Sequence, residues 1–352
     1  MKISIASSSF SDGDAISEDA FGMFKILSQF AEVRLFAKAW NCSSHKIYPI
    51  EESFGFAKGQ KDFFIYCYSE YDPVFLRNLN LISSQKILRY YSITPEIYFR
   101  KWNPEIAKNL KEAKESLVEV VSFFQSVVSI SKYSNKEILD LKKNLQTHIL
   151  FPFMNTNWLA NLDVGHLELK KKEEIDLLAV GRIAPNKNLE FLIDVLSILN
   201  TNPKKKFNLK IVGSIPEGLK NYYESLEERI SKKKQGTQVQ FLGKLAPSEL
   251  KKLYLSSELY LSASLHEGFG IPALEAIHFS LPIFVLSNAA VSEVLPFPKY
   301  LATGKSSASS FAAGVKKILN SSRFSMNFPA QKFLHQNYSE YQFSKTLRSI
   351  IK

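Results

Sequence analysis

The chain has 352 residues, about twice the length of a typical domain, and 45% of them are apolar, so two globular domains of similar size account for it. The formal net charge of +11 favours anionic partners such as nucleotide diphosphates, acidic lipid surfaces or nucleic acid. Two cysteines without paired spacing argue against a disulfide framework, and no apolar run approaches the ~20 residues of a membrane span. We therefore expect a cytoplasmic protein, with peripheral contact on the inner face of the membrane as the alternative.

Short apolar runs in residues 1–157 alternate with helical patterns, which predicts a Rossmann-like α/β domain. The first run is followed by a small polar loop and then by a helix with an apolar face at Ala20, Met23 and Leu27. The loop lacks a Gly-x-Gly-x-x-Gly sequence, so it does not suggest a dinucleotide redox cofactor. The strands predicted for this domain cover residues 2–6, 32–36, 62–67, 86–91, 127–131 and 149–153.

A long amphipathic helix is predicted over residues 104–124, with one apolar face and one charged, solvated face. Just before it, residues 98–102 combine two cations with three aromatic side chains. The polar residues 155–157 mark the expected hinge, and residues 161–172 form a polar, basic connecting chain. We therefore place the domain boundary between residues 157 and 158.

Residues 158–352 show the same alternation of apolar strands and helices, so a second Rossmann-like domain is predicted. The sequence contains no zinc knuckle or RNP-type aromatic strand, and a nucleic-acid partner is not expected. The histidines do not have the spacing of metal ligands. The strands predicted here cover residues 175–180, 207–212, 239–242, 259–264 and 282–287, and the helices cover residues 248–255, 306–319 and 339–351.

The most specific pattern is the run HEGFGIPALEA at residues 266–276, which follows the apolar strand at 259–264. Pro272 suits the first position of a helix, and the two glycines permit a positive φ or a close approach to a ligand. Glu267 therefore leaves the carboxyl end of a strand, and Glu275 is expected in the first turn of the next helix. Both carboxylates can face the crevice in which open α/β sheets bind ligands, and the free N–H groups at the helix start favour an anion there.

This run resembles the signature of the retaining, nucleotide-sugar-dependent glycosyltransferases of family 4, which contains the same two glutamates eight residues apart. The resemblance implies the GT-B fold, an α/β architecture with two Rossmann-like domains facing each other across a cleft. The second domain then binds the nucleotide sugar, and the first domain binds the acceptor. The resemblance also implies that Glu275 holds the ribose hydroxyls, while the transferred sugar is held by Glu267 and by the backbone of Gly268, Phe269 and Gly270.

The resemblance extends to the loop after the strand at 175–180, where Arg182 and Lys187 match the family's diphosphate-binding arginine and lysine. Arginine offers a planar fork of donors and lysine a mobile point charge, and both suit phosphate oxygens that gain negative charge as they leave. The loop at 9–14, with Gly13, is expected opposite the donor diphosphate. Its Asp-x-Asp pattern binds a divalent cation in glycosyltransferases of the other fold, but here we interpret it as a polar turn. We expect neither a metal nor a cofactor other than the donor.

Two positions depart from the family. The members that most resemble this chain carry histidines where Cys67 and Tyr91 stand, and a histidine in this region lies near the donor sugar and the acceptor. Here Tyr91, Ser92 or another residue makes that polar contact, or activity is weakened. A non-catalytic subunit that binds nucleotide sugars is therefore the alternative function. A nucleotide-sugar epimerase is a third hypothesis, which the glutamate spacing and the Arg-x4-Lys pattern fit poorly.

On this resemblance we expect a retaining hexosyltransferase that moves a sugar from a nucleotide-diphosphate sugar to a glycan or lipid-linked acceptor. Its place would be in the synthesis of a surface polysaccharide, such as lipopolysaccharide, or of a glycolipid. The leaving phosphate is the expected proton acceptor, as same-face transfer implies. His266 either touches the sugar or packs beside its loop, and Glu293 is either a contact or a helix cap. The net charge and the basic, aromatic residues 98–102 motivate a peripheral contact with an anionic membrane.

Overall fold

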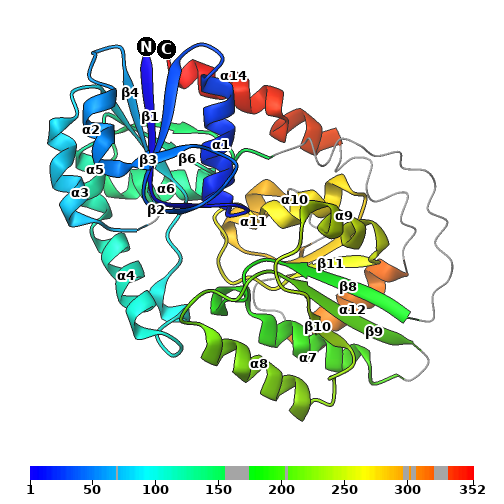
Figure 1. The fold of residues 1–352 in the computed structure, drawn as a ribbon. Coiled ribbons are helices and arrows are strands. Elements are labelled where there is room, and N and C mark those ends of the chain that lie inside the picture. Colours follow the sequence, from blue (N-terminus) through cyan, green and yellow to red (C-terminus); the bar gives the residue numbers. More distant parts are fainter. Residues whose placement is uncertain (69, 155–173, 203–204, 296–300, 303–306, 321–331) are drawn as a thin grey trace. The chain divides into compact units, whose positions relative to one another are not determined.

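The computed structural model describes residues 1–68, 70–154, 174–202, 205–295, 301–302, 307–320 and 332–352 (Figure 1). These residues form two compact units. Unit 1 comprises Met1–Glu96, Ala107–Asn155 and Tyr338–Lys352, and unit 2 comprises Ile97–Ile106 and Thr156–Asn337. The hinge predicted at 155–157 and the connecting chain predicted at 161–172 lie outside the described residues.

Unit 1 is built on a seven-stranded parallel sheet in the order β3-β2-β1-β4-β5-β6-β7. The order changes direction at β1 and β4, as in a doubly wound α/β domain. The predicted Rossmann-like class is therefore confirmed for this unit. Its strands are β1 (Lys2–Ser11), β2 (Glu32–Asn41), β3 (Ile47–Pro49), β4 (Phe63–Tyr68), β5 (Gln85–Tyr90), β6 (Ser126–Ser129) and β7 (Gln146–Ile149).

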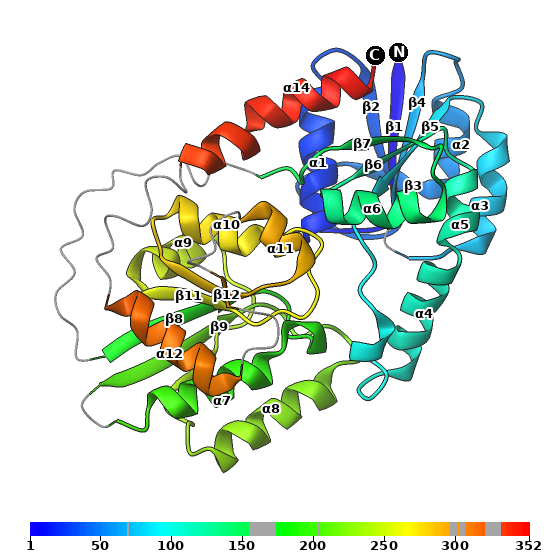
Figure 2. The ribbon, with the colours of Figure 1, turned by 180° about the vertical axis from the view of Figure 1, so that it is seen from behind.

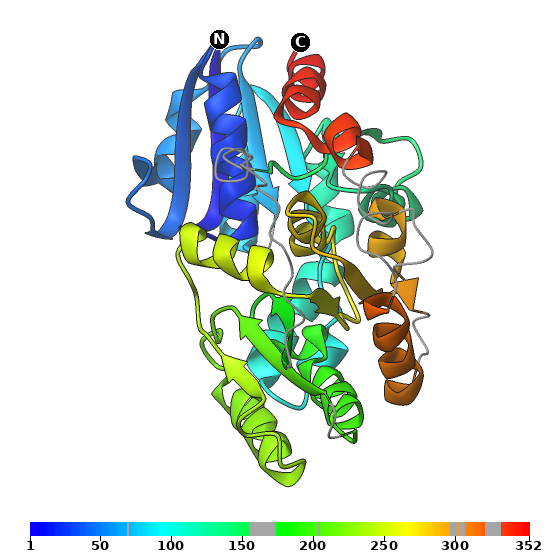
Figure 3. The ribbon, with the colours of Figure 1, turned by 90° about the vertical axis from the view of Figure 1, so that its right-hand side faces the viewer.

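Helices cover both faces of this sheet (Figures 2 and 3). One face packs against α2, α3, α5 and α6, and the other packs against α1 and the C-terminal α14. Two buried faces explain why the strands read as continuous apolar runs rather than as alternating ones. The helices are α1 (Ala15–Leu27), α2 (Ser53–Phe56), α3 (Pro73–Asn78), α4 (Pro104–Glu115), α5 (Leu117–Ser122), α6 (Lys132–Leu141) and α14 (Glu340–Ile350).

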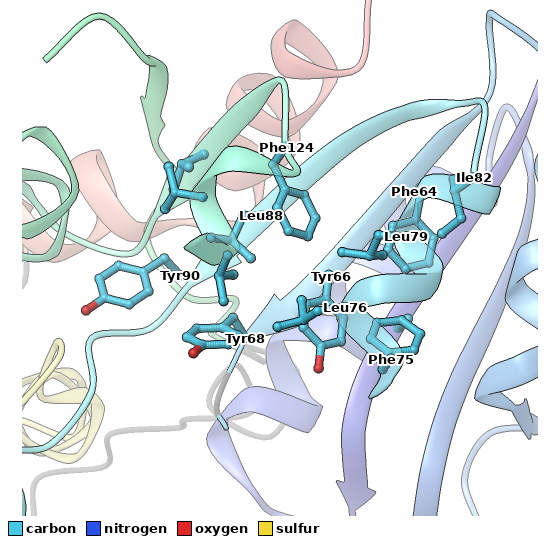
Figure 4. Close-up of a cluster of buried hydrophobic side chains, with 14 of the residues drawn as sticks. Phe64, Tyr66, Tyr68, Phe75, Leu76, Leu79, Ile82, Leu88, Tyr90 and Phe124 are labelled. Atoms are coloured by element: carbon cyan, nitrogen blue, oxygen red, sulfur yellow. The ribbon is translucent and has the colours of Figure 1, made fainter. Parts of the chain in front are cut away.

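The side chains of strand β4 pack alternately into the hydrophobic cores on the two faces of the sheet. Phe64, Tyr66 and Tyr68 point to the side of α3 and α5, where Phe75 and Phe124 complete an aromatic cluster (Figure 4). The intervening residues of the strand face α1 and α14. Because a buried hydroxyl needs a partner, the Tyr68 hydroxyl donates to a main-chain carbonyl, that of Ala113, at 2.8 Å.

A fully buried ion pair fixes the other side of unit 1. The side chains of Arg89 on β5 and Asp19 on α1 are both 0% exposed, and Arg89 Nε donates to Asp19 Oδ2 at 2.8 Å. Arg89 also donates to the carbonyls of Leu150 and Phe151, at 2.6 and 3.3 Å, and Asp19 Oδ1 accepts the N–H of Phe153 at 2.6 Å. Every charged atom is thus hydrogen-bonded, the condition under which a buried pair is tolerated.

The strand predicted at 149–153 is wrong in its bounds, because residues of this segment bond to the ion pair. The last strand instead ends at Ile149, because the polar backbone groups beyond Leu150 bond to Arg89 and Asp19 rather than to a neighbouring strand. The helix predicted at 104–124 is also divided, since α4 and α5 are separated at Ser116. Its expected apolar face is nevertheless buried at Ala113, Leu117, Val121 and Phe124.

The C-terminal helix packs in unit 1, whereas the sequence boundary at 157/158 assigned it to the second domain. Phe343 and Leu347 of α14 are buried in the core formed with α1, and Phe343 stacks edge-on with Phe153 at 5.2 Å between ring centroids. The apolar stripe of a helix identifies a core-facing side but not the core that it joins. The sequence therefore predicted the helix but not its place.

Unit 2 contains a six-stranded parallel sheet in the order β10-β9-β8-β11-β12-β13. Helices α9 and α10 lie on one face, and α7 and α12 lie on the other (Figures 1 and 2). Its strands are β8 (Glu174–Val180), β9 (Lys206–Val212), β10 (Val239–Phe241), β11 (Leu259–Ser262), β12 (Ile283–Leu286) and β13 (Leu301–Ala302). Its helices are α7 (Leu189–Leu199), α8 (Lys220–Lys232), α9 (Pro247–Ser256), α10 (Ile271–His278), α11 (Ala289–Val294) and α12 (Ala308–Leu319). None of the helices in the described part of the chain is long and apolar enough to span a bilayer.

Removing one partner of the buried pair tests its role in the fold. Asp19→Asn leaves the Arg89 guanidinium buried without its counter-charge, so we expect the free energy of unfolding to fall by about 3–5 kcal/mol. Urea denaturation measures this loss. Glu340→Gln is the control, because it breaks the Lys25–Glu340 pair, whose side chains are 44% and 29% exposed, and such pairs contribute less than about 1 kcal/mol. Equal effects of the two substitutions would contradict the assignment.

Candidate active site

The candidate site lies at the carboxyl edge of the unit 2 sheet, where the loops after β8 and β11 meet. The strand ends approach closely: a Cβ on Gly213 would lie 2.0 Å from the Gly181 carbonyl oxygen, so a larger residue at 213 would displace the backbone. The Gly181 N–H donates to the Val212 carbonyl at 2.9 Å, and the Gly213 N–H donates to the Gly243 carbonyl at 2.8 Å. Glycines thus end three neighbouring strands.

The loop after β8 places Lys187 over this edge. Residues Pro185–Lys187 form a 3-10 turn, and Asn188 follows in the left-handed region with φ 52° before α7 begins. The lysine stem passes beside Gly181, since a Cβ there would lie in ordinary contact with Lys187 Cε at 3.4 Å. The backbone of the loop therefore determines where the ammonium can reach.

The loop after β11 is tied to its neighbours by side-chain amides. Asn186 Nδ2 donates to the His266 carbonyl at 3.3 Å, and the Asn186 carbonyl accepts the Leu265 N–H at 2.9 Å. Asn288 Nδ2 donates to the Ser264 carbonyl at 3.2 Å. Three loops at the ends of neighbouring strands are thereby joined into one surface.

Lys187 and Glu267 form an ion pair, with Nζ 2.6 Å from Oε1. Burial acts to raise the pKa of Glu267, but the Lys187 ammonium and the Ser264 hydroxyl outweigh it, and the pKa lies below its usual value. Glu267 is therefore an anion at neutral pH. It can accept hydrogen bonds from hydroxyl donors, as a sugar requires.

Glu275 is in the opposite electrostatic state. Burial raises its pKa to about 7, although the hydroxyl of Tyr254 opposes this shift by donating to Oε2 at 2.8 Å. The ring of Tyr254 on α9 is buried and stacks with Phe279 at 5.3 Å between centroids, which holds the hydroxyl in place. The two glutamates thus share one region of the sheet edge but differ in their tendency to ionise.

The remaining residues predicted for the donor site surround these two glutamates. Arg182 follows β8 and is exposed, and Phe269 is buried beneath the loop that it shares with Gly268. Gly270 has φ 98° and precedes α10, which begins at Ile271. The helix starts one residue before the predicted Pro272, so Glu275 lies in its second turn rather than its first.

Gly13 and the Asp-x-Asp pattern belong to unit 1 and form a turn. Asp14 caps α1 by accepting the N–H groups of Ile16 and Ser17, and Asp12 accepts hydrogen bonds from the loop at Ser43. Among the described residues, no group of three or more His, Cys, Asp or Glu side chains could hold a metal ion.

Sequence reasoning missed Tyr254, Ser264 and the amides of Asn186 and Asn288. Tyr254 lies in a helix that was predicted, but its contact with Glu275 joins residues 21 apart through the packing of α9 on α10. The apolar spacing of α9 did not distinguish a buried tyrosine that supports a site from one that only fills the core.

The two positions at which histidines were expected lie together in unit 1. The Tyr91 hydroxyl donates to Asp19 Oδ2 at 2.7 Å and to Cys67 Sγ at 3.5 Å. Burial, followed by the Asp19 carboxylate, raises the pKa of Tyr91 well above its usual value. Ser92 donates instead to Glu137 Oε2 at 2.7 Å. Tyr91 is therefore part of the buried Arg89–Asp19 network.

Comparison with known proteins shows what part of this chain is similar to. Residues 167–333 match the family described as Glycosyl transferases group 1. The chain is 25% identical over 254 residues to an uncharacterized glycosyltransferase of Methanocaldococcus jannaschii, covering 67% of this chain and 62% of that protein. It is 32% identical over 126 residues to the O-antigen chain mannosyltransferase of Salmonella typhimurium, covering 36% and 33%. The chain thus spans less than two thirds of the length of these relatives.

Solved structures share the fold across the whole chain. The Anabaena protein HepE in complex with UDP and glucose superimposes with a TM-score of 0.77 at 14% identity, covering 100% of this chain and 99% of that one. Sucrose-phosphate synthase from Thermosynechococcus elongatus gives 0.75 at 14% identity, covering 99% and 98%. These superpositions show that the chain has the GT-B fold. Residues 167–333, just under half of the chain, resemble the group 1 glycosyltransferases.

The raised pKa of Glu275 predicts a pH-dependent cost to stability. The pKa of the Glu275 carboxyl is 4.5 in the unfolded chain and about 7 in the folded chain, so the folded chain binds this proton more tightly. The folded chain therefore loses stability as the pH rises from about 4.5 to 7. Glu275→Gln cannot ionise and should be more stable than the native chain at pH 8, by on the order of 1–3 kcal/mol, with little difference at pH 4.5. Thermal unfolding at both values measures this.

A suitable control is Glu228→Gln, which alters a glutamate side chain on α8 that is 71% exposed. Its effect should not change between the two pH values. A Glu275→Gln variant that is equally destabilised at both would show that the carboxylate is not penalised by burial.

Proposed function

We propose that the chain is a retaining glycosyltransferase that moves a hexose from a nucleotide-diphosphate sugar to a glycan or lipid-linked acceptor. The observation that carries the proposal is the meeting of Lys187, Glu267 and the start of α10 at one sheet edge. The relative named for the O-antigen chain supports a role in the synthesis of a surface polysaccharide or glycolipid. The Anabaena structures with UDP and with UDP-glucose support a nucleotide-sugar donor.

Each group has a part in this reaction. Arg182 and Lys187, with the N–H groups at the start of α10, hold the diphosphate and stabilise the negative charge that it gains as the glycosidic bond breaks. Glu275 accepts hydrogen bonds from the ribose. Glu267 and the backbone of Gly268–Gly270 hold the hydroxyls of the sugar. The leaving phosphate oxygen takes the proton of the incoming acceptor hydroxyl, which delivers the acceptor to the face that the phosphate leaves.

The function is tested by incubating the full chain with a panel of sugar nucleotides and measuring release of the nucleoside diphosphate, with and without an acceptor. The anomeric configuration of the product, read by NMR, tests retention. The reaction should survive EDTA, because Arg182 and Lys187 supply the positive charge. Inversion, or activity lost to EDTA and restored by magnesium or manganese, would contradict the respective part of the proposal.

The place of Tyr91 favours a second candidate, a subunit that binds nucleotide sugars without transferring them. Its hydroxyl is engaged with Asp19 and Cys67. The sequence resemblance implies histidines at positions 67 and 91. Donor binding without turnover of any sugar nucleotide in the panel would support this candidate over the first. Turnover would reject it.

Arg182→Ala and Lys187→Ala should each lower kcat by about 10²-fold or more, as for loss of a preorganised charge-stabilising donor. Both variants are compared with Lys220→Ala, which removes an exposed lysine of α8 and should leave kcat unchanged. Circular dichroism establishes that the variants remain folded. Unchanged kinetics in both site variants would remove these cations from the mechanism.

We also propose that the chain contacts an anionic membrane peripherally from the cytoplasm. In the structure Phe99 is buried, and Trp102 packs edge-on against Tyr222 with ring centroids 5.1 Å apart. Both rings therefore pack within unit 2. Arg100 and Lys101 remain exposed and could approach lipid head groups. Each cation near such a surface contributes about 1 kcal/mol.

Arg100→Ala combined with Lys101→Ala should therefore weaken binding to anionic vesicles by roughly thirtyfold, measured by co-sedimentation. Binding should fall as salt is raised and should be absent with neutral vesicles. No binding of the native chain to anionic vesicles at low salt would leave an acceptor in solution as the better hypothesis.

A further inference from the structure

The Lys187–Glu267 pair joins the two groups assigned above to different halves of the donor. Lys187 is assigned to the diphosphate and Glu267 to the sugar, yet their side chains contact each other at 2.6 Å and are 20% and 16% exposed. A diphosphate that takes the ammonium must take it from this carboxylate. The two assignments are therefore linked by competition.

We propose that Glu267 makes the site prefer a complete sugar nucleotide to the free nucleoside diphosphate, because Glu267 and the diphosphate compete for Lys187. A nucleoside diphosphate that takes Lys187 leaves Glu267 without its cation. A sugar nucleotide also takes Lys187, but its hydroxyls donate to Glu267 in return. This inference rests on the proposed function and extends it: the donor binds more tightly than the product that it leaves behind.

The surroundings of Glu267 make the loss of its cation costly. The carboxylate is largely buried, and a buried charge without a partner is strongly disfavoured. The Ser264 hydroxyl is a neutral donor to it, and a second carboxylate, that of Glu275, lies close enough that both acidic groups act on Tyr260. Hydroxyl donors on a sugar could replace the lost hydrogen bonds of Glu267.

The surroundings of Lys187 allow the exchange. Its stem lines a small pocket together with Gly181, Ser262 and Ser264, and Gly181 presents no side chain to it. The ammonium is a mobile point charge on a flexible stem, so it can turn from one anion to another while the backbone at Asn188 stays in place. Movement of one side chain is enough.

The test compares affinities for product and donor by calorimetry on the full chain. UDP and UDP-glucose form one pair of probes, and GDP and GDP-mannose form the second. In Glu267→Gln the competition for Lys187 is removed, so the nucleoside diphosphate should bind about fivefold more tightly. The sugar nucleotide should not share this gain, and the preference for it should fall.

A matched control is available in the same unit. Lys210 and Asp176 form a pair of 2.8 Å with side chains 21% and 17% exposed, close to the values for Lys187 and Glu267. Asp176 lies near the start of β8, at the opposite end of the strand from the site. Asp176→Asn should therefore leave both affinities unchanged.

A double-mutant cycle separates competition for Lys187 from simple removal of a negative charge near the phosphates. In a Lys187→Met background, Glu267→Gln should bring no further gain in affinity for UDP or GDP. An equal gain in that background would overturn the inference. If Glu267→Gln does not fold, Glu267→Asp serves instead, because its shorter side chain withdraws the carboxylate from Lys187.

The outcomes also separate this inference from the function on which it rests. If the native chain binds no nucleoside diphosphate or sugar nucleotide in the panel, the donor site itself is wrong and both proposals fail. If it binds both classes, and Glu267→Gln leaves their ratio unchanged, the donor site stands and only the competition is rejected.

Discussion

The contact between Lys187 and Glu267 joins the loops that follow two neighbouring parallel strands, β8 and β11. Parallel strands bring their carboxyl ends to one edge, so residues 80 positions apart in the chain meet there. The glycines at 181 and 213 permit the close approach of the strand ends, and the turn before Asn188 directs the lysine towards that edge. The candidate site thus follows from the order of the parallel strands, and the Lys187–Glu267 pair lies where the two loops meet.

The chain contains a second acid–base contact with the opposite physical character. Arg89 and Asp19 are fully buried, and their remaining polar atoms are bonded to the backbone of residues 150–153. Removing either partner would leave a buried charge, so this pair is fixed for the lifetime of the fold. Lys187 and Glu267 retain partial access to solvent and can exchange partners. Burial thus separates a structural pair from one suited to binding a ligand.

The sequence predicted what local patterns encode. Apolar runs located most strands of both sheets, and the run at 266–276 located the loop that carries both glutamates. The contacts that join distant residues had no such signal. The buried pair links residues 70 apart in the chain. Because Arg89 donates to the Leu150 carbonyl, the apolar run at 149–153 does not form the expected strand. Helix α14 was recognised by its apolar stripe, but a stripe does not say which of two cores it enters. The partner of Lys187 was likewise unpredictable, because both residues were assigned to a ligand rather than to each other.

The side chains of Cys67 and Tyr91 are in contact. These are the two positions at which the sequence departs from the histidines of the family that it resembles. The Tyr91 hydroxyl bonds to both Cys67 and Asp19, so a residue at one position depends on the other. Burial raises the pKa of Cys67 to about 12 and that of Tyr91 well above its usual value, so neither side chain exchanges a proton at neutral pH. A transfer reaction on this chain therefore takes no base from these positions. The proposed same-face mechanism requires no base at these positions, because in it the departing phosphate takes the proton.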